Sequence, residues 1–485
     1  MSKLAELDPL AAGIDVGSEQ MFVSIAGGPP EVFGSTTTQL QKLRNWLLSH
    51  HVKSAAVEAT GIYWLCLYEV LEEAGIKVLV VNGRYVKNLP GRKTDMKDCQ
   101  WLATMHSHGL LRSGFVPASH IRRLQDYVRL RQDHIAMAAS HVQHMQKAME
   151  RMNIKLHDVI RSVTGVSGLR VIRAILAGER EPRMLIRLCD EQIRGKKADR
   201  LAEALHGTWR AEHLFALRQA LEAWEFYQKQ IQECDRAIEA VLRESCTTQS
   251  DSHQTPPEGG TPVQCAPLSP AVEPAVDSET AQQCEALESG RAPATKAVVK
   301  AKKRGPNTPK IADLHGMLVQ ICGGKDATAI PGIADHTLLQ LVSEVGTDLS
   351  PWPTVKHFTS WLGVCPGSHQ SGKRNRRGRR QMNRAGRMFC MIAMAVGRSV
   401  DKGLGGFYRR LKGRRGAQVA IKALARKIAI FYWQCMTNGL EFVEEGLAKY
   451  QEKAAQTQLR FLQKLANDHG LMLLQKSCVQ QGVIG

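Results

Sequence analysis

The sequence has no segment that resembles a membrane span or a secretory signal. Its 485 residues contain no apolar run of about 18 or more, the length that a transmembrane helix requires. The first ten residues carry Lys3, Glu6 and Asp8 and lack the long apolar stretch of a signal peptide. We therefore expect a cytoplasmic protein with no membrane partner.

A recognisable cysteine pattern is also missing. The twelve cysteines are scattered from Cys66 to Cys478, and no two stand in the C-x-x-C spacing that is typical of zinc sites. Disulfide frameworks are typical of small secreted domains, whereas this chain is large and has no expected signal. We expect reduced thiols, most of them buried.

Acidic residues are nearly absent from one stretch near the C-terminus. Between Ser371 and Lys427 there are 18 lysines and arginines against one acid, Asp401, a difference of 17. This stretch therefore holds nearly the whole net charge of +19. A solvated surface normally mixes both signs, so the pattern indicates a polyanionic partner.

The first hundred residues predict an α/β domain. Short apolar runs predict strands, and runs with helical periodicity predict helices. Strands are expected at 11–17, 20–26, 31–37, 54–59 and 77–82, and helices at 40–48, 63–73 and 96–106. This is the ribonuclease H-like order. The main alternative, a doubly wound nucleotide-binding fold, would need a G-x-G-x-x-G loop after the first strand, where the sequence has only GIDVGS.

The rest of the chain predicts a helical arm, a linker and a mainly helical domain. Long helices at 122–152 and 209–242 favour a coiled-coil arm, with a plain helical bundle as the alternative. Nine of the 19 prolines lie between Cys246 and Pro309, which is typical of a disordered linker. The IPGI sequence at 330–333, followed by a helix, resembles a helix-hairpin-helix turn; a simple Pro-Gly turn is the alternative.

A chain of this length exceeds one hydrophobic core. The expected segments are a ribonuclease H-like metal-carboxylate domain at 10–118, the arm at 119–245, the Pro-rich linker at 246–310, a serine-bearing DNA-binding domain at 311–445 and a helical tail at 446–485.

Four carboxylates stand at positions where such a sheet would bind metal. Asp15 ends the first strand and Glu58 the fourth, and these strands are neighbours in a ribonuclease H-like sheet. Asp95 and Asp98 are three residues apart and share one helix face. Together they would supply oxygen ligands for two Mg²⁺ ions. Each acid alone could instead be a turn residue or a helix N-terminal acid.

Ser371 precedes a glycine and a run of guanidinium groups. A hydroxyl that attacks a phosphodiester needs its proton removed and the developing charge neutralised, which neighbouring cations favour. A phosphate-binding loop is the alternative. The residues expected to contact nucleic acid are Lys373, Arg374, Arg376, Arg377, Arg379, Arg380, Arg384, Arg409, Arg410 and Lys412.

Several motifs together resemble the transposases of insertion sequence family 110. They are GIDVG, VEATGIYW, VNGRYVKNLPGRKTDMKDCQWLA, IPGIADHTLLQLVSEVG, FTSWLGVCPGSHQSGKRNRRG and GFYRRLKGRRGAQVAIKALARKI. The likeness covers roughly residues 10–160 and 325–440, in the family's order. The Pro-rich segment is longer than the connection expected from the family.

This resemblance implies a Holliday-junction-resolvase-like domain in which Asp15, Glu58, Asp95 and Asp98 bind Mg²⁺. It implies a serine nucleophile that matches Ser371, with Ser368 as second choice, and a covalent phosphoserine link to DNA. It also implies double-stranded donor and target DNA, a structured non-coding guide RNA, and a homodimer that assembles into a tetramer. The host would be bacterial and the protein nucleoid-associated.

Two alternatives remain at the level of sequence. A carboxylate-only junction resolvase or nuclease would hydrolyse DNA with water and would not need the serine. A non-enzymatic RNA- or DNA-binding protein would use the four acids only structurally.

Overall fold

The computed structural model describes residues 6–59, 61–81, 95–252, 307–366, 369–371, 374–376, 381–399, 403–439, 441, 452, 455–456 and 459–471. For residues 95, 248–252, 369–371 and 374–376 it describes the backbone alone. The chain divides into two units, residues 1–118 and 119–485, which are described separately.

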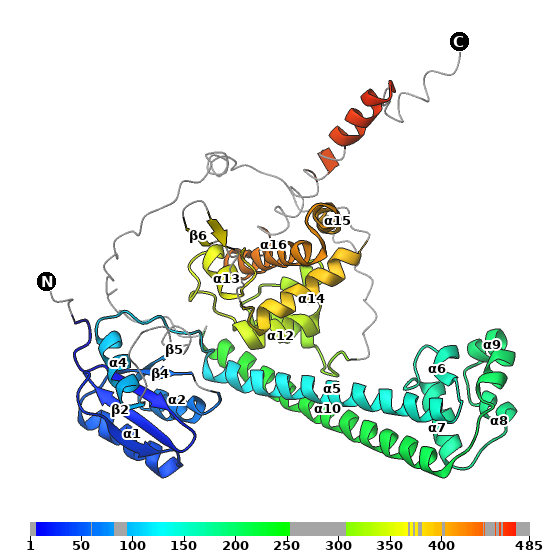
Figure 1. Cartoon of the computed structure of the whole chain (residues 1–485), viewed down its shortest axis with the longest axis horizontal. Coiled ribbons are helices and arrows are strands. Elements are labelled where there is room, and N and C mark those ends of the chain that lie inside the picture. The colour runs from blue at the N-terminus through cyan, green and yellow to red at the C-terminus, as the bar shows by residue number, and fades with distance from the viewer. Residues whose placement is uncertain are drawn as a thin grey trace. The chain divides into compact units, whose positions relative to one another are not determined.

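The N-terminal unit is built on a five-stranded sheet in the order β3-β2-β1-β4-β5 (Figure 1). The strands are β1 (Ala12–Val16), β2 (Gln20–Ile25), β3 (Glu31–Gly34), β4 (Ser54–Glu58) and β5 (Lys77–Val81). β1, β2 and β3 are antiparallel, whereas β4 is parallel to β1 and β5 is parallel to β4. The predicted ribonuclease H-like order is confirmed.

Helices cover both faces of this sheet. They are α1 (Thr37–Ser49), α2 (Trp64–Glu73) and α4 (Asp95–Ser107). On one face, buried leucines of α1 and α2 pack with Ile14 and Val57 in a single core. On the other face, Leu102 of α4 packs against Ala56 and Val81. Burial on both faces explains why the parallel strands are almost continuously apolar in sequence.

Two long helices form the arm of the second unit. α5 (Ser119–Arg151) and α10 (Ala211–Ser252) lie side by side (Figure 1). Between them in sequence come α6 (Leu156–Val159), α7 (Val166–Leu176), α8 (Pro182–Arg187) and α9 (Glu191–Ala204). Residues of these short helices share an apolar core with the ends of the long helices. Pairing of two long helices is as predicted; coiled-coil packing stays a prediction.

The second arm helix is longer than the sequence indicated. α10 runs to Ser252, past the expected start of the linker at residue 246. Cys246 is buried, and its thiol lies 3.7 Å from the carbonyl of Met317, so packing keeps the chain helical there. The rest of the expected linker, residues 253–306, lies outside the described residues.

The C-terminal part is mainly helical. Its elements are α11 (Leu314–Ile321), η1 (Ala327–Ala329), α12 (Asp335–Val345), α13 (Val355–Trp361), β6 (His369–Ser371), β7 (Arg374–Arg376), α14 (Arg384–Arg398), α15 (Leu404–Arg415) and α16 (Ala417–Asn438). Phe358, Phe389 and Tyr432 are fully buried at its centre, where Phe358 stacks on Tyr432 and Phe389 meets both rings edge to face. The sequence did not predict the β6–β7 hairpin.

The IPGI turn packs tightly against another helix. Gly332 has φ +89°, and a Cβ built there would lie 2.5 Å from Val396 and 2.9 Å from Ile392 of α14. The following helix begins with Asp335, which accepts from His315 at 3.0 Å. The turn therefore has a packing role, and its resemblance to a helix-hairpin-helix motif stays a prediction.

Residues 459–468, within the expected tail, are helical. Among the described helices, none is long and apolar enough to cross a membrane.

Candidate active site

Asp15 and Glu58 lie on the same face of the N-terminal sheet. Successive side chains of a strand alternate between faces, and Ile14 points into the core beside α1 and α2. Gly13 and Asp15 therefore point to the opposite face. Ile14 is paired with Val57 in the parallel register, so one further residue along each strand sets Asp15 beside Glu58.

That face is covered by α4 at very short range. A Cβ built on Gly13 would lie 2.2 Å from the backbone nitrogen of Ala103 and 2.3 Å from the carbonyl oxygen of Cys99. Only glycine allows the strand and the helix to approach so closely. Asp15 is two residues further along the same face, and its charge acts on Cys99, so it lies toward the N-terminal half of α4.

Asp98 lies in this N-terminal half of α4. Burial, with smaller contributions from the nearby charges of Asp15 and Asp98, raises the pKa of the Cys99 thiol to about 11. Both carboxylates are thus close to one thiol. Asp95 begins the helix one turn earlier and shares a helix face with Asp98, although its side chain is not described.

The chemistry of this group suits a divalent cation. Glu58 is only 6% exposed, and Asp15 and Asp98 are half-buried. Two carboxylates of the sheet and one of the helix that covers it offer the hard oxygen ligands that Mg²⁺ prefers. The donor set therefore fits the expected metal.

A second polar cluster holds the other end of α4, and no motif in the sequence predicted it. The Ser54 hydroxyl donates to Asp8 Oδ2 at 2.6 Å and lies 2.7 Å from Nε2 of buried His106. Burial lowers the pKa of His106; the charge of Asp8 opposes this shift and that of Lys77 adds to it. The cluster fixes the position of α4 relative to β4. It thereby also fixes the orientation of the N-terminal end of α4, which carries Asp95 and Asp98.

Ser371 lies in the second unit, at the tip of a β-hairpin. It is the last residue of β6 and pairs with Arg374, while His369 pairs with Arg376. Ser368, Lys373, Arg377, Arg379 and Arg380 lie outside the described residues.

The chain before the hairpin touches the chain after it. Asn383 caps α14 by accepting from the nitrogen of Gly386 at 2.7 Å, and its Nδ2 donates to the carbonyl of Trp361 at 3.1 Å. Gly363 has φ +74°, and a Cβ there would lie 2.6 Å from the carbonyl oxygen of Gln381. The two described segments that flank the hairpin in sequence are therefore held together.

The described basic residues fall into two groups. Arg410 and Lys412 are exposed on α15, and Arg409, also exposed, donates to the carbonyl of Ser399 at 2.9 Å. Arg384 is different, because its guanidinium pairs with Glu344 at 3.3 Å and donates to Gln132 at 2.5 Å. Nucleic-acid contact by these residues stays a prediction.

Another group with metal-ligand atoms lies in the arm, far along the chain from the expected ligands. Ligand atoms of Glu150, His157 and Asp158 lie within 4.8 Å of one another. Lys155 forms an ion pair with Glu150, and this ammonium group lowers the pKa of the carboxyl. We interpret the group as an ion-pair cluster.

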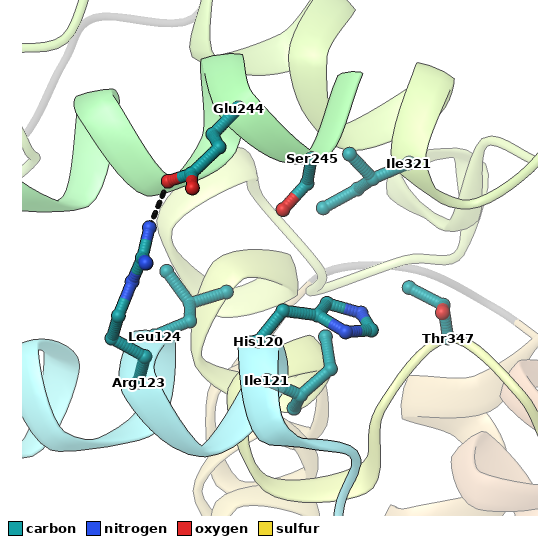
Figure 2. A pocket seen from close by; sticks show the side chains of 8 residues that line it. All are labelled: His120, Ile121, Arg123, Leu124, Glu244, Ser245, Ile321 and Thr347. Atoms are coloured by element: carbon teal, nitrogen blue, oxygen red, sulfur yellow. Dashed lines mark hydrogen bonds and ion pairs between the residues drawn. The ribbon is translucent and has the colours of Figure 1, made fainter. Parts of the chain in front are cut away.

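A cavity of about 220 Å³ lies at the base of the arm (Figure 2). Its lining residues are His120, Ile121, Arg123, Leu124, Glu244, Ser245, Ile321 and Thr347. Arg123 forms an ion pair with Glu244 at one side, and burial together with Arg123 lowers the pKa of His120. The cavity is smaller than typical ligand pockets of about 300–1,000 Å³ and shares no lining residue with the expected site.

Comparison with known families agrees with this division of the site. A model described as "Transposase", for the IS110 group, matches residues 12–154, which include the four acids of β1, β4 and α4. A model described as "Transposase IS116/IS110/IS902 family" matches residues 325–409, which include Ser371 and α14. No curated protein matches the chain. Two models in order along one chain identify it as a member of the IS110 family of transposases, enzymes that cut and rejoin DNA.

Proposed function

We propose that this transposase cuts and rejoins DNA through Ser371, assisted by Mg²⁺ held by Asp15, Glu58, Asp95 and Asp98. The observation that supports the proposal is the β1–β4 register, which sets Asp15 beside Glu58, together with the action of the Asp15 charge on Cys99, the residue after Asp98 in α4. When bound, the cation would supply positive charge to neutralise the charge that develops on the phosphate oxygens. The protein fixes its ligands by packing β1 directly on α4.

The proposed serine step conserves the number of phosphate ester bonds. The Ser371 oxygen forms a bond to phosphorus while one bond from phosphorus to a deoxyribose oxygen breaks. The serine loses its proton, and the released deoxyribose oxygen gains one. A second transfer onto a new deoxyribose hydroxyl reverses these changes, so rejoining requires no nucleotide cofactor.

We further propose a structured non-coding RNA and a multimeric assembly as partners. The resemblance implies both, and the basic stretch from Ser371 to Lys427 provides charge for more than one nucleic acid. Base pairing by the RNA would select donor and target DNA, while the protein binds phosphates. A dimer that becomes a tetramer would hold the two duplexes.

A covalent-trapping experiment tests the nucleophile and the carboxylates. Protein co-expressed with the element's RNA is mixed with Mg²⁺ and labelled element-junction DNA, then denatured and separated on a gel. We expect a slow protein–DNA band for the wild type that is lost in Ser371→Ala and in Asp15→Asn. Glu73→Gln, an exposed carboxylate of α2, is the matched control and should keep the band.

The other outcomes point to named alternatives. A band that survives Ser371→Ala but is lost in Ser368→Ala moves the nucleophile to Ser368. Cleaved DNA without any covalent band indicates a nuclease that uses water. Full activity of Asp15→Asn would contradict the proposed role of the carboxylates in cleavage. Repeating the reaction without the RNA tests the guide, which should be required for site choice.

A further inference from the structure

Glu344, at the end of α12, joins the arm to the serine-bearing domain. Its carboxylate is 9% exposed on the side chain and accepts two hydrogen bonds from Arg129 of α5, from Nε at 2.9 Å and from a terminal nitrogen at 2.7 Å. The same carboxylate lies 3.3 Å from Nε of Arg384. A guanidinium that donates two hydrogen bonds to one carboxylate is among the strongest polar contacts in proteins.

Two glutamines of α5 complete the junction. Gln125 donates to the carbonyl of Ser343 at 2.9 Å and to Glu344 at 3.3 Å. Gln132 accepts from Arg384 at 2.5 Å. Together with Arg129 they lie on one face of α5, at helical spacings of four and three residues, so about two turns of the arm meet the domain here.

Arg384 lies at the foot of the hairpin. It is the first residue of α14, directly after Asn383, which bonds to Trp361 on the near side of the hairpin. A displacement of Arg384 would therefore act on Asn383 and Trp361, which flank the hairpin on its two sides in sequence. The chain of contacts runs from α5 through Glu344 and Arg384 to the residues that flank the hairpin in sequence.

We infer that Glu344 is a positioning residue that fixes the serine hairpin relative to the arm, and that Arg384 acts as its structural partner instead of a phosphate ligand. This rests on the proposed role of Ser371. All five donors of a guanidinium lie in one plane, and Arg384 already directs two of its nitrogens to Glu344 and Gln132.

The first test separates positioning from DNA binding. In the trapping reaction, Glu344→Gln should form the covalent complex about 10- to 100-fold more slowly at saturating DNA, as expected for a misplaced nucleophile. The DNA concentration for half-maximal rate should change less than about twofold. Glu344→Asp, which keeps the carboxylate, should recover part of the rate.

Glu225→Gln is the matched control. Glu225 pairs with Arg173 at 2.6 Å between α10 and α7, so its loss removes an arginine–glutamate pair from the arm without touching the hairpin. It should react at the wild-type rate. A wild-type rate for Glu344→Gln would overturn the inference.

The second test uses Arg384→Gln, which leaves the Arg129–Glu344 pair in place and so provides a variant should Glu344→Gln fail to fold. We expect a slower reaction but an unchanged dependence of DNA affinity on salt concentration. A slope lowered by about one would identify Arg384 as a phosphate ligand and overturn the inference.

Ser371→Ala, run in parallel, keeps the two proposals apart. If it still forms the complex, the nucleophile is wrong. If it is inactive while Arg384→Gln and Glu344→Gln react normally, the nucleophile stands and the positioning role fails.

Discussion

Gly13 has no Cβ, and the backbone of α4 occupies the space where a Cβ would lie. Gly13→Ala would place Cβ 2.2 Å from a backbone nitrogen, so strand and helix must separate. We expect a loss of about 1–3 kcal/mol or more in the stability of the N-terminal unit, and slower Mg²⁺-dependent cleavage as Asp15 shifts from Asp98. Calorimetry and the trapping reaction measure the two effects.

Gly413→Ala provides the control, because a Cβ there meets no atom within 4 Å. Inside α15 this change should be neutral or stabilising by roughly 0.5–1 kcal/mol. A Gly13→Ala protein as stable and active as this control would contradict the close packing of β1 on α4.

The buried histidine predicts acid sensitivity of the N-terminal unit. Burial lowers the pKa of His106, so the unfolded chain takes up a proton on this residue before the folded chain does. Stability should therefore fall as pH falls from about 6.5 toward the lowered pKa. His106→Gln keeps an Nε2 donor for Ser54 but cannot titrate in this range. The free energy of unfolding of this variant should therefore depend less on pH. Identical pH profiles of denaturant unfolding for the two proteins would rule His106 out as its cause.

At the residue scale, the sequence predicted which strands carry the carboxylates, but not which side chains and backbone atoms pack around them. Asp15 and Glu58 could be placed because each ends an apolar strand, and strand pairing then follows from the fold class. The contact of Gly13 with Ala103, and the bonds of Ser54 with Asp8 and His106, depend on the distance between a strand and a helix. That distance has no periodic signal in the chain.

Within the arm, one ion pair between the two long helices is buried. Arg131 Nε lies 2.6 Å from Asp235, and their side chains are 6% and 3% exposed. Asp235→Ala should cost about 3–5 kcal/mol in denaturant unfolding, because it leaves a buried guanidinium without its carboxylate. It also removes the acceptor for the backbone nitrogen of Lys310 at 3.0 Å.

An exposed pair on the same helix is the control. Arg243 and Glu239 are one turn apart at 2.7 Å, and Glu239→Gln should cost less than about 1 kcal/mol. A double replacement, Arg131→Met with Asp235→Leu, should recover most of the loss. If the single Asp235→Ala change costs no more than Glu239→Gln, the pair is not buried in solution.

Elements with strong periodicity were predictable, and short polar ones were not. α5 and α10 show apolar residues at helical spacing over many turns, so their existence was clear from sequence. β6 and β7 have three residues each, HQS and RNR, without an alternating apolar face. Their pairing therefore left no pattern, and the hairpin that presents Ser371 was missed.

At the scale of the whole molecule, the carboxylates and the serine belong to different units of the chain. If a working site combines the acids of one protomer with the serine of another, two inactive proteins should complement each other. Co-expressed Asp15→Asn and Ser371→Ala chains should form the covalent complex, each variant alone should not, and the trapped chain should be the Asp15→Asn one. Persistent inactivity of the mixture would mean that one protomer supplies both parts.

The buried pair in the arm also has a consequence for synthesis on the ribosome. Arg131 is made 104 residues before Asp235. At roughly 5–20 residues per second, the arginine spends about 5–20 s without its partner. Residues near the arm's far end, such as Met149 and Leu217, are much closer in sequence and can meet earlier. In the nascent chain, α5 and α10 should therefore pair from the far end of the arm toward its base.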